Sequence, residues 1–153
     1  MAVTALMYGK AIANAFGGET AGESSKVDWL SDDIRVALVT SAYTPNQDTD
    51  EFWSDVVANE VVGTGYTANG AALANKTLTY TAGTNVNKFD ADDVSWPAST
   101  ITARYAVIYN RTPGSDATRN LISYVDFGAN VSSTNGNFQI TWDAAGIATI
   151  TVA

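Results

Sequence analysis

The strongest constraint on the fold is a succession of short runs of Val, Ile, Thr and aromatic residues, separated by Gly, Asn, Asp and Pro. Such runs are typical of β-strands, and the separating residues are typical of turns. In residues 101–109 apolar side chains occupy both alternating faces, and residues 34–39 repeat this pattern, so we expect two central strands covered on both sides. Further strands are predicted within residues 76–81 and 121–127. The pattern predicts an all-β fold, namely an antiparallel β-sandwich or a jelly roll.

Residues 137–152 are predicted to form a β-hairpin. Apolar residues alternate with polar ones from Phe138 to Trp142, and a β-rich tail follows Gly146. Asp143 is suited to open a type I turn, and Gly146 supplies the left-handed conformation that a bulged hairpin needs three residues later.

Helix is predicted to be scarce, below about 15% of the chain. One short helix is expected within residues 48–58, where Asp48 and Asp50 offer capping side chains, followed by a strand at 60–63. The first sixteen residues fit a helix and a strand equally well, and a Gly pair at 17–18 ends either one. No repeat or linker divides residues 1–153, so we expect a single domain of about eight to ten strands. The predicted core residues are Val36, Leu38, Tyr105, Val107, Phe138 and Ile140.

The chain contains neither histidine nor cysteine. This removes imidazole bases, thiolate nucleophiles, disulfides and the preferred ligands of transition metals. We therefore predict no catalytic residue, no cofactor and no metal site, and a binding or structural role rather than an enzyme. The net charge of −8 argues against nucleic-acid binding. No run approaches the ~20 apolar residues of a membrane span, and no basic start marks a secretory signal.

Three other sequence patterns suggest binding or catalysis and are weighed against simpler interpretations. Residues 63–70 are rich in Gly but lack the spacing of a nucleotide-binding loop, so we interpret them as a surface loop. Paired carboxylates can serve a glycosidase, yet a chain with 16 acidic residues contains many chance pairs. Two acidic clusters lack the EF-hand spacing, and calcium at the second of them stays an open alternative. These clusters are Asp48, Asp50 and Glu51, and Asp90, Asp92 and Asp93.

The candidate protein-contact residues are Trp29, Trp53 and Tyr66. Trp29 and Trp53 lie in loop or helix contexts, where we expect exposed rings, and Tyr66 lies in the Gly-rich loop. Large exposed aromatic side chains usually mark protein contacts. Trp96 and Trp142 instead lie in or beside alternating strands, so we predict that both pack in the core.

Several segments follow one another in a characteristic order. They are residues 27–38 (VDWLSDDIRVAL), 43–48 (YTPNQD), 60–66 (EVVGTGY), 90–96 (DADDVSW), 102–109 (TARYAVIY), 126–128 (DFG) and the tail that begins at 135 (NGNF). In this order, and over roughly residues 5–153, the sequence resembles a family of small structural proteins of tailed bacteriophages. Residues 18–26 are longer and richer in Gly and Ser than this resemblance leads us to expect.

The resemblance implies a virion protein with no catalytic motif, most simply a capsid decoration (cement) protein on the outer surface of the phage head. It would be made in the bacterial cytoplasm, bind the major capsid protein and neighbouring virion proteins, and form a homo-oligomer, without contacting nucleic acid or a membrane. The alternative is a tail or head-fibre module that binds host-surface glycans. Apolar patches at the termini would favour docking to virion proteins, whereas exposed Trp or Tyr lining a groove would favour glycans.

Overall fold

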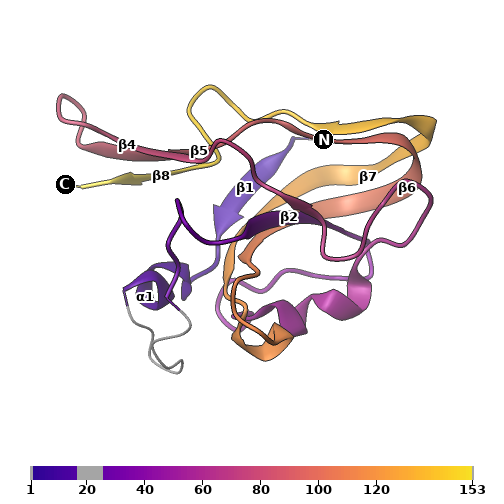
Figure 1. The fold of residues 1–153 in the computed structure, drawn as a ribbon, viewed down its shortest axis with the longest axis horizontal. Coiled ribbons are helices and arrows are strands. Elements are labelled where there is room, and N and C mark those ends of the chain that lie inside the picture. The colour runs from indigo at the N-terminus through magenta and orange to yellow at the C-terminus, as the bar shows by residue number, and fades with distance from the viewer. Residues whose placement is uncertain (1, 17–25, 153) are drawn as a thin grey trace.

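The computed structural model of the protein describes residues 2–16 and 26–152. Strands make up 47% of the chain and helical residues 10%, which confirms the predicted antiparallel all-β sandwich with one short helix (Figure 1). The elements, in chain order, are β1 (Thr4–Met7), α1 (Ala11–Ala15), β2 (Ile34–Val39), the 3₁₀ turns η2 (Trp53–Asp55) and η3 (Val57–Asn59), β3 (Ala71–Ala72), β4 (Thr77–Thr81), β5 (Val86–Asp90), β6 (Val94–Asn110), the 3₁₀ turn η4 (Asp116–Thr118), β7 (Leu121–Ile140) and β8 (Ala148–Thr151).

The larger sheet has five antiparallel strands in the order β1-β7-β6-β2-β3. β2 pairs with β6 from Ile34 opposite Asn110 to Val39 opposite Tyr105. Five of its six residues are buried, because side chains on both of its faces are covered, as the two-sided alternation predicts.

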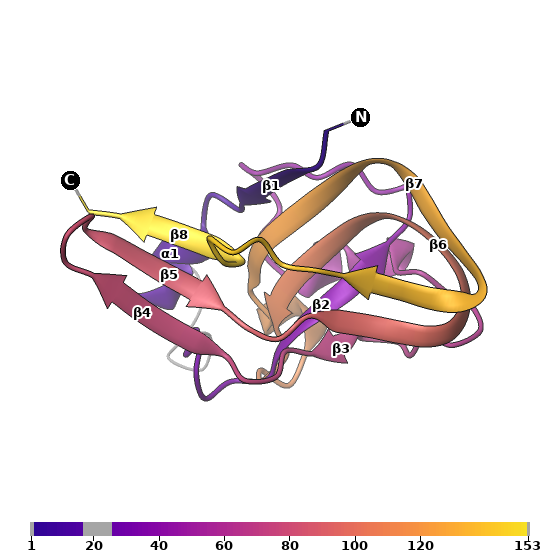
Figure 2. The same cartoon turned by 90° about the horizontal axis from the view of Figure 1, so that it is seen from above.

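The long strands β6 and β7 form a ribbon that folds over on itself. Their pairing runs from Val94 opposite Ile140 to Tyr109 opposite Leu121. The register shifts at four places along the ribbon, one of them between Ala103 and Tyr105. Figures 1 and 2 show the ribbon turning back at the end far from the C-terminus. One half of the ribbon therefore lies over the other, and the two halves supply the two layers of the sandwich.

The smaller sheet has three antiparallel strands in the order β4-β5-β8. It projects from the body above α1 in Figure 1, and Figure 2 looks down through it onto the same helix. Phe89 of β5 packs edge-on against Trp29, with ring centroids 5.5 Å apart, and so fixes this sheet to the body. We call the sheet of β4, β5 and β8 the wing.

Two hydrophobic clusters cover the two faces of the five-stranded sheet. The inner cluster fills the space between the layers and includes Trp96 and Phe138. The outer cluster lies under residues 43–57 and is built around Trp53 and Tyr109. Of the predicted core residues, Val36, Leu38, Val107, Phe138 and Ile140 are buried and Tyr105 is half-buried.

The predicted hairpin at 137–152 is wrong in its pairing, although its turn forms. The Gly146 N–H donates to the Asp143 carbonyl at 2.8 Å, and Gly146 has a φ of +96°. The tail then leaves β7 and pairs with β5, with Ala148 opposite Phe89. Two hydrogen bonds direct the tail away from β7 and toward β5. Before the turn the indole of Trp142 donates to the Asp92 carbonyl at 3.0 Å, and after the turn the Ile147 N–H donates to the Phe89 carbonyl at 2.8 Å.

Two further local predictions are corrected. Residues 48–58 contain the two 3₁₀ turns η2 and η3 instead of an α-helix, because the Asp55 side chain, rather than Asp48 or Asp50, accepts the backbone N–H groups that precede the first turn. Residues 60–63 contribute one isolated bridge, from Glu60 to Val39, and no strand. Residues 2–16 hold both a strand and the helix, so each of the two alternatives is correct for part of the segment. The Gly pair at 17–18 lies outside the described residues.

Candidate functional site

The prediction that Trp29 and Trp53 are exposed contact residues is wrong. Trp29 retains 5% of its accessible surface, and its indole N–H donates to the Thr77 carbonyl at 3.0 Å. Trp53 is fully buried and stacks on Tyr109, with centroids 4.3 Å apart and planes 8° apart. Both rings are part of the hydrophobic clusters, because the surrounding loops fold over them, and neither offers a face to a partner.

Tyr66, the third candidate, is half-buried and serves mainly as an anchor. Its hydroxyl donates to Glu60 Oε1 at 2.7 Å and accepts the Leu38 N–H at 3.0 Å, and its ring contacts Trp96. Burial, reinforced by the neighbouring Glu60, raises the pKa of Tyr66, and burial also raises the pKa of the Glu60 carboxyl. These contacts hold the Gly-rich loop against β2. A partner contact for the exposed part of Tyr66 stays a prediction.

The best candidate for a binding surface is the strip between the two terminal segments. We call it the terminal seam and define it as the surface between residues 3–16 and residues 139–152, continued under the wing. A groove between β1 and the turn at Gly146 forms one end of the seam. A second groove, between α1 and the underside of the wing, forms the other end. A small cavity links the two grooves, because it shares Met7 and Ile147 with the first and Ile12 and Phe89 with the second, so the seam is continuous.

Exposed apolar side chains gather along the terminal seam. Among the described residues, ten large apolar side chains are exposed, and six of these line the seam. The six are Val3, Leu6, Ile12, Phe16, Leu78 and Val152. Phe16 is 87% exposed and Val3 is 64% exposed. Contiguous apolar surface of this kind marks a site of protein contact more often than scattered single residues do.

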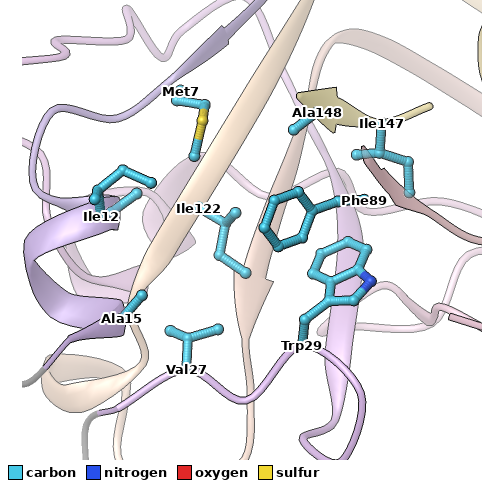
Figure 3. Close-up of a pocket in the computed structure, with 10 residues that line it drawn as sticks. Met7, Ile12, Ala15, Val27, Trp29, Phe89, Ile122, Ile147 and Ala148 are labelled. Carbon is cyan, nitrogen blue, oxygen red and sulfur yellow. The ribbon is translucent and has the colours of Figure 1, made fainter. Parts of the chain in front are cut away.

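A small cavity opens beneath the middle of the seam (Figure 3). Its walls are apolar and include Met7, Ile12, Trp29, Phe89 and Ile122. The cavity measures about 60 Å³, whereas small-molecule sites usually measure about 300–1,000 Å³ and place a few polar groups to orient the ligand. This space is therefore a gap in the packing between α1 and the wing rather than a small-molecule site.

The acidic clusters do not gather into a cation site. In the described residues, no group of three or more carboxylates is placed to hold a metal ion. Asp90 forms an ion pair with Lys88 at 3.1 Å, and the Asp92 carboxylate accepts a hydrogen bond from the Asn75 amide. The Asp93 carboxylate accepts one from the backbone N–H of Trp142. These three side chains therefore serve three different structural contacts. In the other cluster Glu51 accepts Lys10 Nζ at 2.6 Å.

Other polar side chains inside the molecule join loops to sheets. The Tyr43 hydroxyl donates to Asp50 at 2.7 Å and lies 2.8 Å from the Tyr8 hydroxyl, and burial raises the pKa of both phenols.

No helix among the described residues is long and apolar enough to cross a membrane.

Comparison with protein-family models, curated proteins and solved structures extends this description no further. No match was found in any of the three.

Sequence reasoning treated apolar patches at the termini as a sign of docking but missed the residues that compose such a patch. Val3, Leu6 and Phe16 stand out in the sequence only as members of a mildly apolar start. These side chains are exposed because the C-terminal tail pairs with β5 of the wing and does not cover β1. No local sequence pattern indicates that choice of partner. The aromatic signal led to Trp29 and Trp53 instead, because a large ring is equally compatible with a core and with a contact surface.

Proposed function

We propose that the protein is a structural component of a bacteriophage virion, a decoration protein that binds the outer surface of the assembled head through the terminal seam. The observation that carries the proposal is the gathering of exposed apolar side chains along that seam. The resemblance of the ordered sequence segments to small structural proteins of tailed phages supplies the setting.

The charge of the chain supports the outer rather than the inner surface of the head. With 16 acidic against 8 basic residues the protein is repelled by packaged DNA. A clamp on the outer face also needs no chemistry, because it acts by binding the assembled shell more tightly than the separate subunits. The absence of histidine and cysteine from the sequence is compatible with such a role.

The placement of the aromatic rings favours docking over glycan binding. A sugar platform commonly uses exposed indole faces, but Trp29, Trp53 and Trp96 are buried and Trp142 is half-buried against the inner cluster. Among the described residues, the large exposed rings are Phe16 in the seam and Tyr80 on the wing, and neither is a tryptophan. The seam is instead lined mainly by aliphatic side chains, which suit the apolar contacts of a protein interface.

The test is to prepare heads that lack this protein, add the purified chain back, and measure both binding and the temperature at which the heads fall apart. We expect saturable binding to assembled heads, none to unassembled major capsid protein, and a higher disruption temperature at saturation.

Equal disruption temperatures with and without bound protein would remove the cement role and leave a passive decoration. Failure to bind heads, combined with binding to purified host polysaccharide, would replace the proposal with the glycan-binding alternative.

A further inference from the structure

The outer edge of the wing is an open β-strand. β4 pairs with β5 along one side, and in Figure 2 it forms the outer border of the wing, with no other element beside it. All five of its residues, Thr77–Thr81, are exposed. The described contact on this edge is at its inner end, where the Thr77 carbonyl accepts the Trp29 indole N–H.

β4 also lacks the features by which proteins usually protect such an edge. Charged residues, Pro and bulges commonly block strand edges against further pairing, because an unpaired edge accepts any suitable strand. The sequence of β4, TLTYT, contains neither charge nor Pro, and its pairing with β5 has no register shift. Other sheet edges are shorter or partly covered: β3 has two residues, and the last carbonyl of β1 accepts the Gln47 amide at 2.6 Å. β8, at the opposite edge of the wing, is also uncharged, but it has four residues and only every second one is exposed.

The sequence of β4 is complementary to itself in an antiparallel arrangement. A two-fold axis through Thr79 would place Thr77 opposite Thr81 of a second copy, and Leu78 opposite its Tyr80. Residues directly opposite each other lie on the same face of a sheet, so Leu and Tyr would meet on the apolar underside and the Thr side chains on the other face. Like charges would not face each other along the strand, although each chain carries a net charge of −8.

The shape of the wing leaves room for this arrangement. In the antiparallel pairing, the turn between β4 and β5 of one copy would lie beside the inner end of β4 of the other. That turn is formed by small uncharged residues, Ala82 to Asn85, and a Cβ added at Gly83 would meet no atom within 4 Å. The wing also projects from the body (Figure 1), so the bulk of each copy stays clear of the axis.

We propose that two copies of this chain associate through β4, joining their wings into one continuous six-stranded antiparallel sheet with its two-fold axis at Thr79. The self-complementary, uncharged edge favours a second copy over a strand of another protein. Five residue pairs bury less than the ~1,200 Å² of a standard stable interface, so the association is weak in free solution and strengthens where copies are held side by side. The inference does not depend on the virion role.

Cross-linking through a single introduced cysteine tests the pairing, because the natural chain contains none. In Thr79→Cys the two thiols would face each other across the axis, at a separation suited to a disulfide. The matched control is Thr149→Cys. Lys88 pairs with Thr79 on one side and with Thr149 on the other, so Thr149, which is also exposed, lies at the matching position on the opposite edge of the wing. Under mild oxidation we expect Thr79→Cys to form a covalent dimer at least about tenfold faster than Thr149→Cys.

Charge exchange at the axis gives a second measurement by sedimentation equilibrium. Thr79→Lys and Thr79→Glu should each shift the wild-type monomer–dimer equilibrium toward monomer, and an equimolar mixture of the two should restore dimer. Equal cross-linking rates for the two cysteine variants, or a mixture that stays monomeric, would overturn the proposal. A third outcome is also informative. If the wild-type protein is monomeric and both charge variants fail to bind heads, the edge pairs with a strand of a virion partner instead of a second copy.

Discussion

At the scale of single residues, polar groups of this protein join neighbouring strands as well as loops. Arg104 shows how: its Nε and Nη2 donate to the two carboxylate oxygens of Asp126 at 2.8 and 3.0 Å, and the Gly128 N–H adds a bond of 2.7 Å. This pair bridges β6 and β7 where their register shifts. The Arg104 guanidinium lowers the pKa of Asp126 below its usual range.

A lowered carboxyl pKa in the folded state predicts an acid-sensitive contribution to stability. The contribution is fully present above the ordinary Asp pKa of about 4 and is lost as the pH falls through the folded-state value. Asp126→Asn should therefore be less stable than wild type at pH 7 and should lose less stability between about pH 5 and pH 2. Urea unfolding across this range measures both.

Arg104→Gln is the matched variant, because it removes the largest cause of the lowered pKa of Asp126 and leaves the carboxylate and its bond from the Gly128 N–H in place. Its acid-side loss should shrink like that of Asp126→Asn, and the double variant should resemble either single one. An unchanged pH dependence in both single variants would contradict the assignment.

Trp53 provides a second prediction at this scale. The ring is fully buried on Tyr109, so Trp53→Ala removes a large apolar contact and leaves a cavity. We expect a loss of about 3–5 kcal/mol in the free energy of unfolding, measured in urea. Val62→Ala, at a side chain that is 95% exposed, should change stability by less than about 0.5 kcal/mol. A loss below about 1 kcal/mol in Trp53→Ala would mean that the outer cluster is not closed in solution.

At the scale of elements, the sequence predicts strands better than it predicts their partners. The alternation in residues 34–39 and 101–109 specifies β2 and the end of β6, because two-sided burial leaves a periodic pattern in the sequence. The pattern from 137 to 152 correctly indicates a strand, a turn and a second strand. It suggests that the two strands pair with each other, yet β8 pairs with β5. Partner choice depends on contacts distant in sequence, such as Ile147 with the Phe89 carbonyl, and local periodicity does not encode them.

Gly146 decides where the tail goes, and its substitution tests this. A Cβ there would lie 2.6 Å from the Phe89 carbonyl oxygen, and the φ of +96° disfavours any L side chain. Gly146→Ala should therefore destabilise the protein by about 1–3 kcal/mol and loosen β8 from the wing, seen as faster amide exchange of β8. Gly83→Ala, in open space at the wing tip, should change the free energy of unfolding by less than about 0.5 kcal/mol and leave the amide exchange of β8 unchanged. Equal effects of the two substitutions would contradict this role for Gly146.

At the scale of the whole molecule, the termini and the wing leave an apolar strip that the rest of the fold does not cover. The two layers bury the inner cluster, and residues 43–57 cover the outer cluster, but nothing in the described residues covers the side between β1 and the tail. Composition favours a binding or structural role, since a chain without histidine and cysteine has few routes to catalysis, and that role stays a prediction. It does not predict the surface, which arises only when the tail bypasses β1 to reach β5.

The proposed docking face predicts which surface substitutions abolish binding to heads. Val3→Asp and Val152→Asp each place a charge at one end of the terminal seam, where both side chains are more than half exposed, so folding should be unaffected while an apolar contact is lost. We expect each to weaken binding to heads at least about tenfold in the add-back assay. Val62→Asp is the control, because Val62 is 95% exposed beside Thr100 and Ser132, in a groove that shares no residue with the seam. If Val62→Asp weakens binding and the two seam variants do not, the head contact lies at the fold of the β6–β7 ribbon instead.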